Sequence, residues 1–343
     1  MFDSNEIQKV GQLLTEPKKI ALISHKNPDG DTLGAALAMM HYLRAKGHQV
    51  EALVPNAFPE FYHWLPGSRE MHIFDQAAKH VRQIISDAEV IFCLDFNSLD
   101  RAGNMAGDLI KASAVKIMID HHLAPSDEFD YCFSVVDTSS TGELVYEFID
   151  ALGDKDNLKI NESLALYTCI MTDTGSFSFS CNRARTYEII ADLIDRGVDA
   201  AKVHKLVYDT FTENRLRLLG FAISSRMLVW NDLHAAVIHL SKEDLNRFDF
   251  QIGDTEGVVN YPLSIAHINL AILMTEKDDI IRLSFRSKGD FDVNLLARKH
   301  FNGGGHRNAS GGNSKLLLPQ VLELLKDILP QYRESLDYQI TLG

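Results

Sequence analysis

The chain is organised around residues 19–31, which read KIALISHKNPDGD. The first part, Lys19 to Ser24, is an apolar run with the length of a buried strand, and a polar turn with one histidine and two aspartates follows it. A helix is predicted next, because apolar residues share one stripe before Gly47 ends the pattern: Leu33, Leu37 and Met40. A strand, a turn and a helix in this order are typical of a parallel sheet that is covered by helices.

The same alternation continues along the first half of the chain. Further strands are predicted at residues 49–54, 89–94 and 115–119, and another at 131–136. Ser140 and Glu143 have the spacing of a capping box, so a helix is predicted to begin there. Strands that alternate with helices predict an α/β fold whose parallel sheet is covered on both faces.

A change of pattern divides the chain into three parts. From about residue 186 to 230 the pattern is helical only, and its apolar residues share one face: Leu216, Leu219, Ile223 and Met227. Beyond that, strands are predicted at 235–240, 270–274 and 280–286, and helices near 292–299 and 319–332. We therefore predict a parallel-sheet domain at 1–185, a helical connector at 186–230 and a smaller mixed α/β domain at 231–343, with a cleft between the two domains.

The net charge of the chain limits the kinds of molecule that it is expected to bind. Of the 343 residues, 47 are Asp or Glu and 34 are Lys or Arg, so the formal charge is −13. Such a chain should not coat long duplex nucleic acid, because phosphate binding needs a positive surface. The excess acid suits divalent cations, although solubility alone also explains it.

The cysteines and the apolar runs predict a cytoplasmic protein. The four cysteines form no C-x-x-C pair, so a thiolate zinc site has no support and buried thiols of a reducing compartment are expected. The first residues lack a basic-then-apolar signal pattern. No apolar run approaches the ~18 residues of a membrane span, so no membrane association is expected.

Polar residues of one kind follow three of the predicted strands. The first strand runs into His25, Asp29 and Asp31, the strand at 89–94 into Asp95, and the strand at 115–119 into Asp120, His121 and His122. In an open parallel sheet ligands bind at the carboxyl ends of the strands, so these side chains are expected at one edge. A single Asp after a strand is often a turn or capping residue, and this alternative stays open for Asp31, which opens a helix.

Carboxylates that crowd one edge repel each other unless cations lie between them. Two divalent ions ~3.5–4 Å apart that share one carboxylate would remove this repulsion. Oxygen and imidazole ligands without thiolate favour manganese or magnesium over structural zinc. The residues alone are thus consistent with a two-metal hydrolase, and the alternative is a set of surface acids that never meet.

These motifs resemble those of the DHH phosphoesterases, a superfamily named after the triplet Asp120-His121-His122. The run from His25 to Asp31, Asp95, the triplet itself and Met171-Thr172-Asp173-Thr174-Gly175 match in order. Near the C-terminus, GGGHRNASG at residues 303–311 resembles the G-G-G-H motif of the DHH-associated C-terminal domain. The likeness covers nearly the whole chain and is greatest to the RecJ-like subgroup of nano-RNases and pAp phosphatases.

The resemblance implies a role for each matching residue. One ion would be held by His25, Asp29 and Asp95, and a second by Asp31, Asp95, His121 and Asp173, with Asp95 shared. His122 would face the substrate phosphate, and Asp120 would orient the neighbouring imidazoles. Water activated by two manganese ions, or by magnesium, would attack phosphorus in line without a covalent enzyme intermediate.

A glycine-rich loop lies in a basic part of the sequence. Gly303, Gly304 and Gly305 allow positive φ, so their N–H groups could converge on an anion, and His306 and Arg307 add donors. A flexible surface turn is the alternative. Residues 282–307 hold six Lys or Arg and two Asp, a net charge of +4. The resemblance implies substrate binding here, with His306 on phosphate and Arg286 on a neighbouring group.

The function implied is manganese-dependent hydrolysis of short oligoribonucleotides (nanoRNA), of pAp, or of both, in a cleft that measures substrate length. A phosphodiesterase for linear or cyclic dinucleotides is the alternative within enzymes, and a non-catalytic RNA- or nucleotide-binding protein is the alternative outside them. Related proteins are often dimers, so a homodimer is an expectation. Phe177 and Phe179 suit either base stacking or core packing, and Arg101 either a phosphate contact or a salt bridge.

Overall fold

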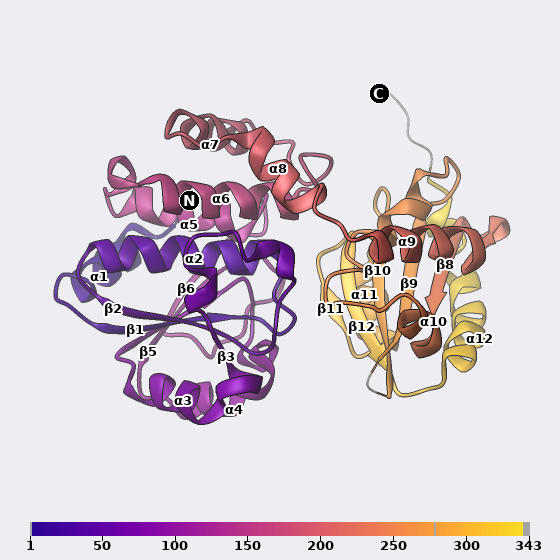
Figure 1. The fold of residues 1–343 in the computed structure, drawn as a ribbon, viewed down its shortest axis with the longest axis horizontal. Coiled ribbons are helices and arrows are strands. Elements are labelled where there is room, and N and C mark those ends of the chain that lie inside the picture. The colour runs from indigo at the N-terminus through magenta and orange to yellow at the C-terminus, as the bar shows by residue number, and fades with distance from the viewer. Residues whose placement is uncertain (1, 278, 339–343) are drawn as a thin grey trace. The chain divides into compact units, whose positions relative to one another are not determined.

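The computed structural model describes residues 2–277 and 279–338. The chain divides into two compact units, Met1–Thr210 and Phe211–Gly343, which we call the first unit and the second unit and describe separately (Figure 1). The strands of the first unit are β1 (Lys19–Ser24), β2 (Gln49–Val54), β3 (His72–Ile73), β4 (Val90–Leu94), β5 (Val115–Asp120) and β6 (Tyr131–Ser134). Its helices are α1 (Ser4–Leu13), α2 (Gly30–Ala45), α3 (Phe74–Asp87), α4 (Ala106–Lys111), α5 (Thr141–Ala151), α6 (Ile160–Asp173), α7 (Ala184–Asp195) and α8 (Ala200–Tyr208).

The first unit is a parallel sheet between two layers of helices. Its strand order is β3-β2-β1-β4-β5-β6, and every neighbouring pair is parallel. Alternate residues of β1 enter different cores: Leu22 packs with α2, α5 and α6, whereas Ile23 packs with α3 and α4. Figure 1 shows these two groups of helices on opposite faces of the sheet. The predicted α/β fold with a parallel sheet is confirmed.

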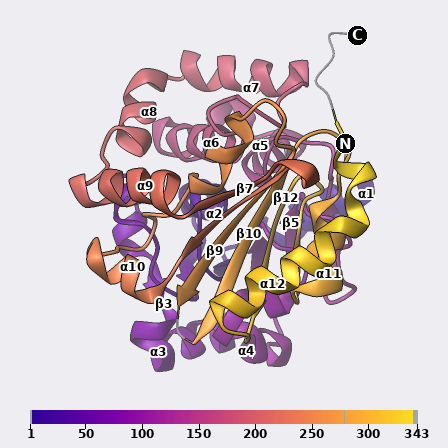
Figure 2. The ribbon, with the colours of Figure 1, turned by 90° about the vertical axis from the view of Figure 1, so that its right-hand side faces the viewer.

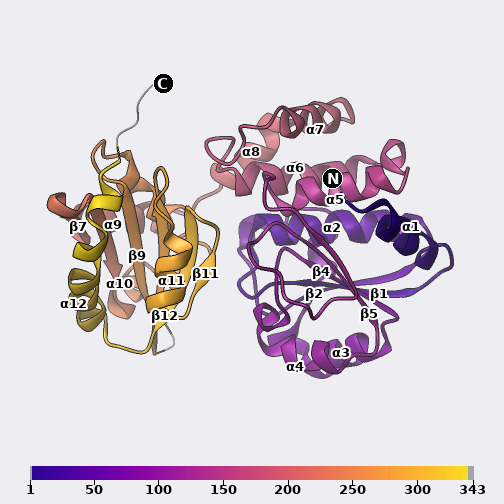
Figure 3. The same cartoon turned by 180° about the vertical axis from the view of Figure 1, so that it is seen from behind.

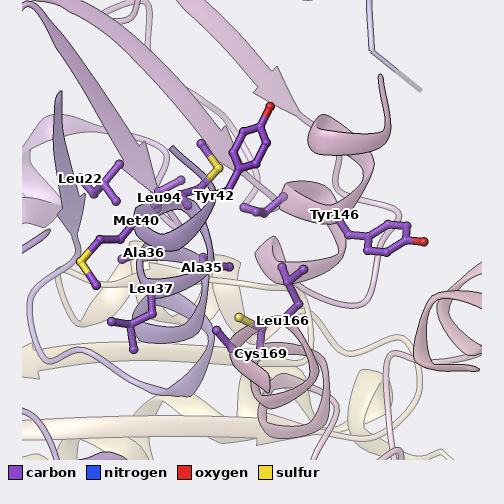
Figure 4. Packing of buried hydrophobic residues seen from close by; sticks show 14 of the residues in the cluster. Leu22, Ala35, Ala36, Leu37, Met40, Tyr42, Leu94, Tyr146, Leu166 and Cys169 are labelled. Atoms are coloured by element: carbon purple, nitrogen blue, oxygen red, sulfur yellow. The ribbon is translucent and has the colours of Figure 1, made fainter. Parts of the chain in front are cut away.

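Small residues let three helices of the first unit approach one another closely. A Cβ atom at Gly34 of α2 would lie 2.5 Å from the Ala165 carbonyl oxygen and from the Cys169 Sγ atom of α6. A Cβ atom at Gly142 of α5 would lie 2.2 Å from the Cys169 Cβ atom. Figure 4 shows Cys169 and Leu166 of α6 in this packed layer with α2. The N-terminal ends of α2 and α5 and the C-terminal end of α6 meet there because glycine leaves room for the neighbouring backbone.

The second unit is a mixed sheet with helices on both faces. Its strands are β7 (Met227–Trp230), β8 (Ala235–Leu240), β9 (Leu270–Lys277), β10 (Ile280–Ser287), β11 (Gly304–Gly305) and β12 (Ala309–Ser314), and its helices are α9 (Glu213–Ser225), α10 (Lys242–Arg247), α11 (Val293–His300) and α12 (Leu318–Ile328). The strand order is β11-β12-β10-β9-β8-β7, and β8 and β9 are the parallel pair. Leu218 of α9 and Leu245 of α10 pack on one face, and Leu296 of α11 and Leu325 of α12 on the other. Figures 2 and 3 show these four helices and the sheet from two sides.

Several elements differ from the prediction. Residues 186–230 are not wholly helical, because α9 ends at Ser225 and Met227 belongs to strand β7. This stretch is also split between the units, with α7 and α8 in the first and α9 in the second. Strand β12 was not predicted, because its sequence ASGGNS lacks β-branched residues. The three-part division at residues 185 and 230, and the cleft, stay predictions.

In the part of the chain that the structure describes, no helix is long and apolar enough to span a membrane.

Candidate metal centre and substrate-binding residues

The candidate metal centre lies at the carboxyl ends of three neighbouring strands. β1, β4 and β5 are adjacent in the sheet. β1 and β4 lead into His25 and Asp95, and β5 ends at Asp120. His121 and His122 follow the last of these strands. The first turn of α2 adds Asp31, its N-cap residue is Asp29, and the last residue of α6 is Asp173. All eight predicted residues of the first unit therefore come from elements whose ends converge at one edge of the sheet.

His25, Asp29 and Asp95 form the first group of candidate ligands. The Nε2 atom of His25 lies 3.3 Å from Asp95 Oδ2 and 3.7 Å from Asp29 Oδ2. Its other ring nitrogen, Nδ1, lies 3.0 Å from the carbonyl oxygen of Lys26, which fixes the ring with Nε2 toward the carboxylates. Asp29 is the N-cap of α2, since its Oδ1 atom accepts hydrogen bonds from the backbone of Asp31 and Thr32. The capping role that the sequence left open for Asp31 therefore belongs to Asp29.

Asp31, His121 and Asp173 form the second group. The Nε2 atom of His121 lies 3.6 Å from Asp31 Oδ2 and 3.5 Å from Asp173 Oδ2. It also lies 3.6 Å from Oδ1 of Asp95, whose Oδ2 atom faces His25. One carboxylate therefore presents a different oxygen atom to each group.

Asp120 and His122 form a direct pair beside these groups. The Nδ1 atom of His122 lies 2.7 Å from Asp120 Oδ1, and the backbone N–H of His122 donates to Asp120 Oδ2 at 3.0 Å. Asp120 is fully buried, so its two oxygen atoms are held by these contacts. The contact with Asp120 orients the ring of His122, and the roles expected for both residues at a metal centre stay predictions.

The buried acids make the centre electrostatically unfavourable without cations. Burial raises the pKa of Asp31 and of Asp95 well above the usual range, and the nearby carboxylates raise it further. Burial lowers the pKa of His25, an effect that the charge of Asp29 opposes and that of Arg101 reinforces. Arg101 also lowers the pKa of Asp95, so its charge acts on this centre.

The donor set fits divalent metal ions. Two atoms that each lie about 2.1 Å from one ion are roughly 3–4 Å apart, and the His–Asp separations in both groups are within that range. In each group the candidate ligand atoms all lie within 4.8 Å of one another. The donors in both groups are carboxylate and imidazole. The nearby Cys169 thiol is not among them: burial raises its pKa, and it donates a hydrogen bond to the Asp31 carbonyl oxygen. Acidic and histidine side chains are thus placed for metal binding.

Sequence reasoning missed two contributors, Thr141 and Gly142 at the start of α5. Their backbone N–H groups donate to the two oxygen atoms of Asp31, at 2.7 and 2.9 Å, and the Thr141 hydroxyl donates to Asp95 Oδ1 at 2.9 Å. The capping pattern at Ser140 and Glu143 marked the start of this helix, and Ser140 does cap it. The pattern gave no signal that the helix begins against the two aspartates.

The glycines of the second unit lie in a tight turn next to strand β12. Gly303 and Gly305 donate their N–H groups within the protein, to Ala297 O and to Asn294 Oδ1. A Cβ atom at Gly303 would lie 2.0 Å from Gly311 O, so glycine permits close pairing of β11 with β12. Of the three glycines only Gly305 has a positive φ, +146°. These glycines shape the turn that carries His306, and at least two of the three do not offer free N–H donors.

The basic residues of this region lie around that turn. His306 is half-buried, and its backbone N–H donates to the Ala309 carbonyl oxygen. The Arg307 guanidinium donates to the Asp290 carbonyl oxygen, and it is paired with that aspartate's carboxylate at 3.1 Å. Arg286, on β10, is half-buried and donates to the Phe285 carbonyl oxygen. The predicted contacts of these side chains with substrate stay predictions.

The two phenylalanines near Asp173 have separate environments. Phe177 packs on the core beside Tyr167 and Tyr187, with ring centroids 6.1 and 6.3 Å away. Phe179 is 44% exposed and lies over Gly175. Core packing is therefore the outcome for Phe177 but not for Phe179.

Comparison with known proteins identifies the class of protein to which this fold and site belong. Residues 19–172 match the DHH family N-terminal domain, and residues 234–332 match the DHHA1 domain. A solved structure of an exopolyphosphatase-related protein from Bacteroides fragilis is 38% identical, with a TM-score of 0.92 over 98% of both chains. The chain belongs to the DHH family and carries a DHHA1 domain, as its motifs predicted.

Two relatives that share one name are similar to this chain over most of its length. The chain is 28% identical to the bifunctional oligoribonuclease and PAP phosphatase NrnA of Bacillus subtilis, over 86% of this chain and 88% of the relative. It is 27% identical to the protein of the same name from Thermus thermophilus, over 92% and 90% of the two chains. RecJ from Thermus thermophilus, solved with Mn²⁺, shares the fold at 12% identity and a TM-score of 0.54, over 95% of this chain and 55% of RecJ.

Proposed function

We propose that this protein is a manganese-dependent phosphoesterase that hydrolyses short oligoribonucleotides, pAp or both. The observation that carries the proposal is that Asp95 faces two groups of candidate ligands through different oxygen atoms. Similarity to two proteins named oligoribonuclease and PAP phosphatase supports the choice of substrates. The absence of thiolate donors from both groups favours manganese or magnesium over structural zinc.

In this proposal the residues of the first unit bind the metal and orient the substrate. His25, Asp29 and Asp95 would hold one ion, and Asp31, Asp95, His121 and Asp173 a second. When bound, two such ions lower the pKa of water and offset the charge of the phosphoryl group. His122, whose Nδ1 atom is bound to Asp120, would contact a phosphate oxygen through Nε2 and stabilise the charge that develops there. No side chain has to form a covalent bond to phosphorus.

The second unit would supply substrate contacts. His306 would bind a phosphate group and Arg286 a neighbouring one, while the glycine turn fixes the position of His306. The net charge of +4 over residues 282–307 suits one short anionic ligand and not a long polymer. A homodimer, the cytoplasmic location and the exclusion of long duplex nucleic acid belong to the same proposal.

A substrate panel tests the proposal. Rates are measured with Mn²⁺ on RNA of two to five nucleotides, on pAp, on cyclic di-adenylate and on pyrophosphate. We expect turnover of the short RNA or of pAp to exceed the others, and to be lost when the metal is chelated. Turnover of pyrophosphate alone would contradict the proposal.

A phosphodiesterase for linear or cyclic dinucleotides is the second candidate. It is favoured by 24% identity to the cyclic-di-AMP phosphodiesterase GdpP of Bacillus subtilis, over 94% of this chain but 49% of that relative. Preferential turnover of cyclic di-adenylate in the panel would support it. A non-catalytic binding protein is tested by calorimetric titration with Mn²⁺, because such a protein would take up no ions.

A further inference from the structure

The start of α5 contacts two of the aspartates that are proposed to bind metal. The backbone N–H groups of Thr141 and Gly142 donate to Asp31, one to each carboxylate oxygen, and the hydroxyl of Thr141 donates to Asp95 Oδ1. Thr141 has no exposed surface, and each aspartate is 2% exposed. Neither the motifs nor the relatives' names assign a role to this helix end.

We propose that Thr141 is a positioning residue that sets the orientation of both aspartates for metal binding. This inference rests on the proposed function, since it concerns the same centre. The hydroxyl of Thr141 reaches the Asp95 oxygen that lies 3.6 Å from His121, the atom through which Asp95 faces the second group. Its hydrogen bond restricts rotation of that carboxylate, so Oδ1 stays toward one group and Oδ2 toward the other.

The hydrogen bonds to Asp31 also restrict the orientation of a carboxylate. Each Asp31 oxygen accepts one backbone N–H, which fixes the plane of the carboxylate and leaves lone pairs of both oxygens for a cation. The helix end therefore holds the Asp31 carboxylate in one orientation.

A buried network holds Thr141 in place. Glu143, which is fully buried, accepts hydrogen bonds at Oε2 from the hydroxyls of Ser139 and Thr186, at 2.5 and 2.7 Å. Its Oε1 atom is paired with Arg183 at 3.2 Å. These contacts tie the turn before α5 to the start of α7, and a network with every member bonded gives a rigid arrangement. These contacts therefore hold the start of α5 in place, and the hydroxyl and N–H groups of Thr141 face the two aspartates.

The experiment compares three variants of the 343-residue chain. Thr141→Val removes the hydroxyl at nearly constant shape, and Thr141→Ser keeps it. Thr168→Val is the matched control, because Thr168 is another fully buried threonine whose hydroxyl donates to the carbonyl oxygen of Leu164 and not to a carboxylate. Mn²⁺ binding to the metal-free protein is measured by calorimetry, and folding is checked by thermal unfolding without metal.

We expect Thr141→Val to bind Mn²⁺ about 10–100-fold more weakly, the usual cost of losing a group that orients a metal ligand. Thr141→Ser should recover most of that loss, and Thr168→Val should bind as the wild type does. Wild-type affinity in a folded Thr141→Val variant, or an equal loss in Thr168→Val, would overturn the inference. Should Thr141→Val not fold, Thr141→Ala takes its place, with the same expectation.

The same titration separates this inference from the proposed function. A wild-type protein that takes up no Mn²⁺ would refute the metal centre itself. A wild type that binds Mn²⁺, together with a Thr141→Val variant of equal affinity, would refute only the positioning role.

Discussion

At the scale of single residues, Asp95 meets three demands at once. It is 2% exposed, it has a left-handed backbone with a φ of +68°, and its two oxygen atoms face two different groups of side chains. Aspartate and asparagine tolerate this backbone better than most residues, because their short polar side chains bond locally. The chemistry and the turn after β4 therefore require the same kind of residue at this position.

Replacement of Asp95 separates its charge from its shape. Asp95→Asn keeps the size and the tolerance of positive φ but removes a metal-binding charge, so we expect hydrolysis to fall by more than ~100-fold. Asp95→Ala should abolish hydrolysis as well, and it should also be less stable by about 1–2 kcal/mol because of the left-handed backbone. Activity assays and urea unfolding measure the two effects. Manganese-dependent turnover close to that of the wild type in either variant would refute the role of Asp95 as the shared ligand.

His48 gives a prediction for pH that is independent of the metal centre. Its Nδ1 atom accepts the backbone N–H of Lys18 at 3.1 Å, and burial, together with Lys46 and Lys18, lowers its pKa from 6.5. Because the pKa of His48 is lower in the folded protein, His48 of the unfolded chain binds a proton more readily. The stability that neutral His48 contributes is therefore present above pH 6.5 and is lost as the pH falls below that value.

The variant His48→Asn tests this directly, because its amide oxygen can accept the same N–H without titrating. We expect the stability of the wild type relative to the variant to decrease as the pH is lowered below 6.5, with urea unfolding as the measurement. Equal pH dependence of the two proteins would show that His48 does not titrate differently in the folded state.

At the scale of elements, the motif residues lie where the ends of strands and helices meet. The positions of the strand ends could be predicted from the sequence. Strands followed by polar residues predicted the edge of the sheet that holds His25, Asp95 and Asp120, because local patterns mark where a strand ends. The contacts of Thr141 with Asp31 could not be predicted, since they join residues 110 positions apart through helix packing. Strand β12 was missed for a similar reason, because its pairing with β10 and β11 and not its own residues makes it a strand.

The close packing of α2 against α6 leads to a prediction for Gly34. Gly34→Ala would place a Cβ atom 2.5 Å from a backbone oxygen of α6, so we expect a loss of about 1–3 kcal/mol of unfolding free energy. Gly107→Ala in α4 is the matched control, since nothing lies within 4 Å of that Cβ position. The control should be stabilised by ~0.5–1 kcal/mol, as alanine is the better helix former.

The two tryptophans allow this measurement to be confined to one unit. Trp64 lies in the first unit and Trp230 in the second, so a Trp230→Phe background leaves fluorescence that reports only on the unit that contains Gly34. Equal stability of Gly34→Ala and Gly107→Ala in this background would contradict the packing argument.

At the scale of the whole molecule, the net charge is concentrated in one unit. Residues 1–210 contain 31 Asp or Glu and 19 Lys or Arg, a charge of −12, whereas residues 211–343 contain 16 and 15, a charge of −1. The unit that carries the candidate metal centre therefore repels polyanions at long range, and bound cations would offset this repulsion only locally. A ligand with few phosphates is repelled less than a long RNA.

This distribution predicts an unusual response to salt. Proteins that bind long nucleic acid through basic surfaces lose affinity steeply as the salt concentration rises. Here we expect hydrolysis of a long single-stranded RNA to stay constant or to rise between ~0.01 and ~0.15 M salt, because the Debye length shortens from about 30 to 8 Å and screens the repulsion. At each salt concentration the long RNA should be cleaved more slowly than RNA of two to five nucleotides, and the difference should narrow as salt is added. Rates measured at fixed Mn²⁺ test this, and a steep fall for the long RNA would show that a basic track, and not the acidic unit, controls its binding.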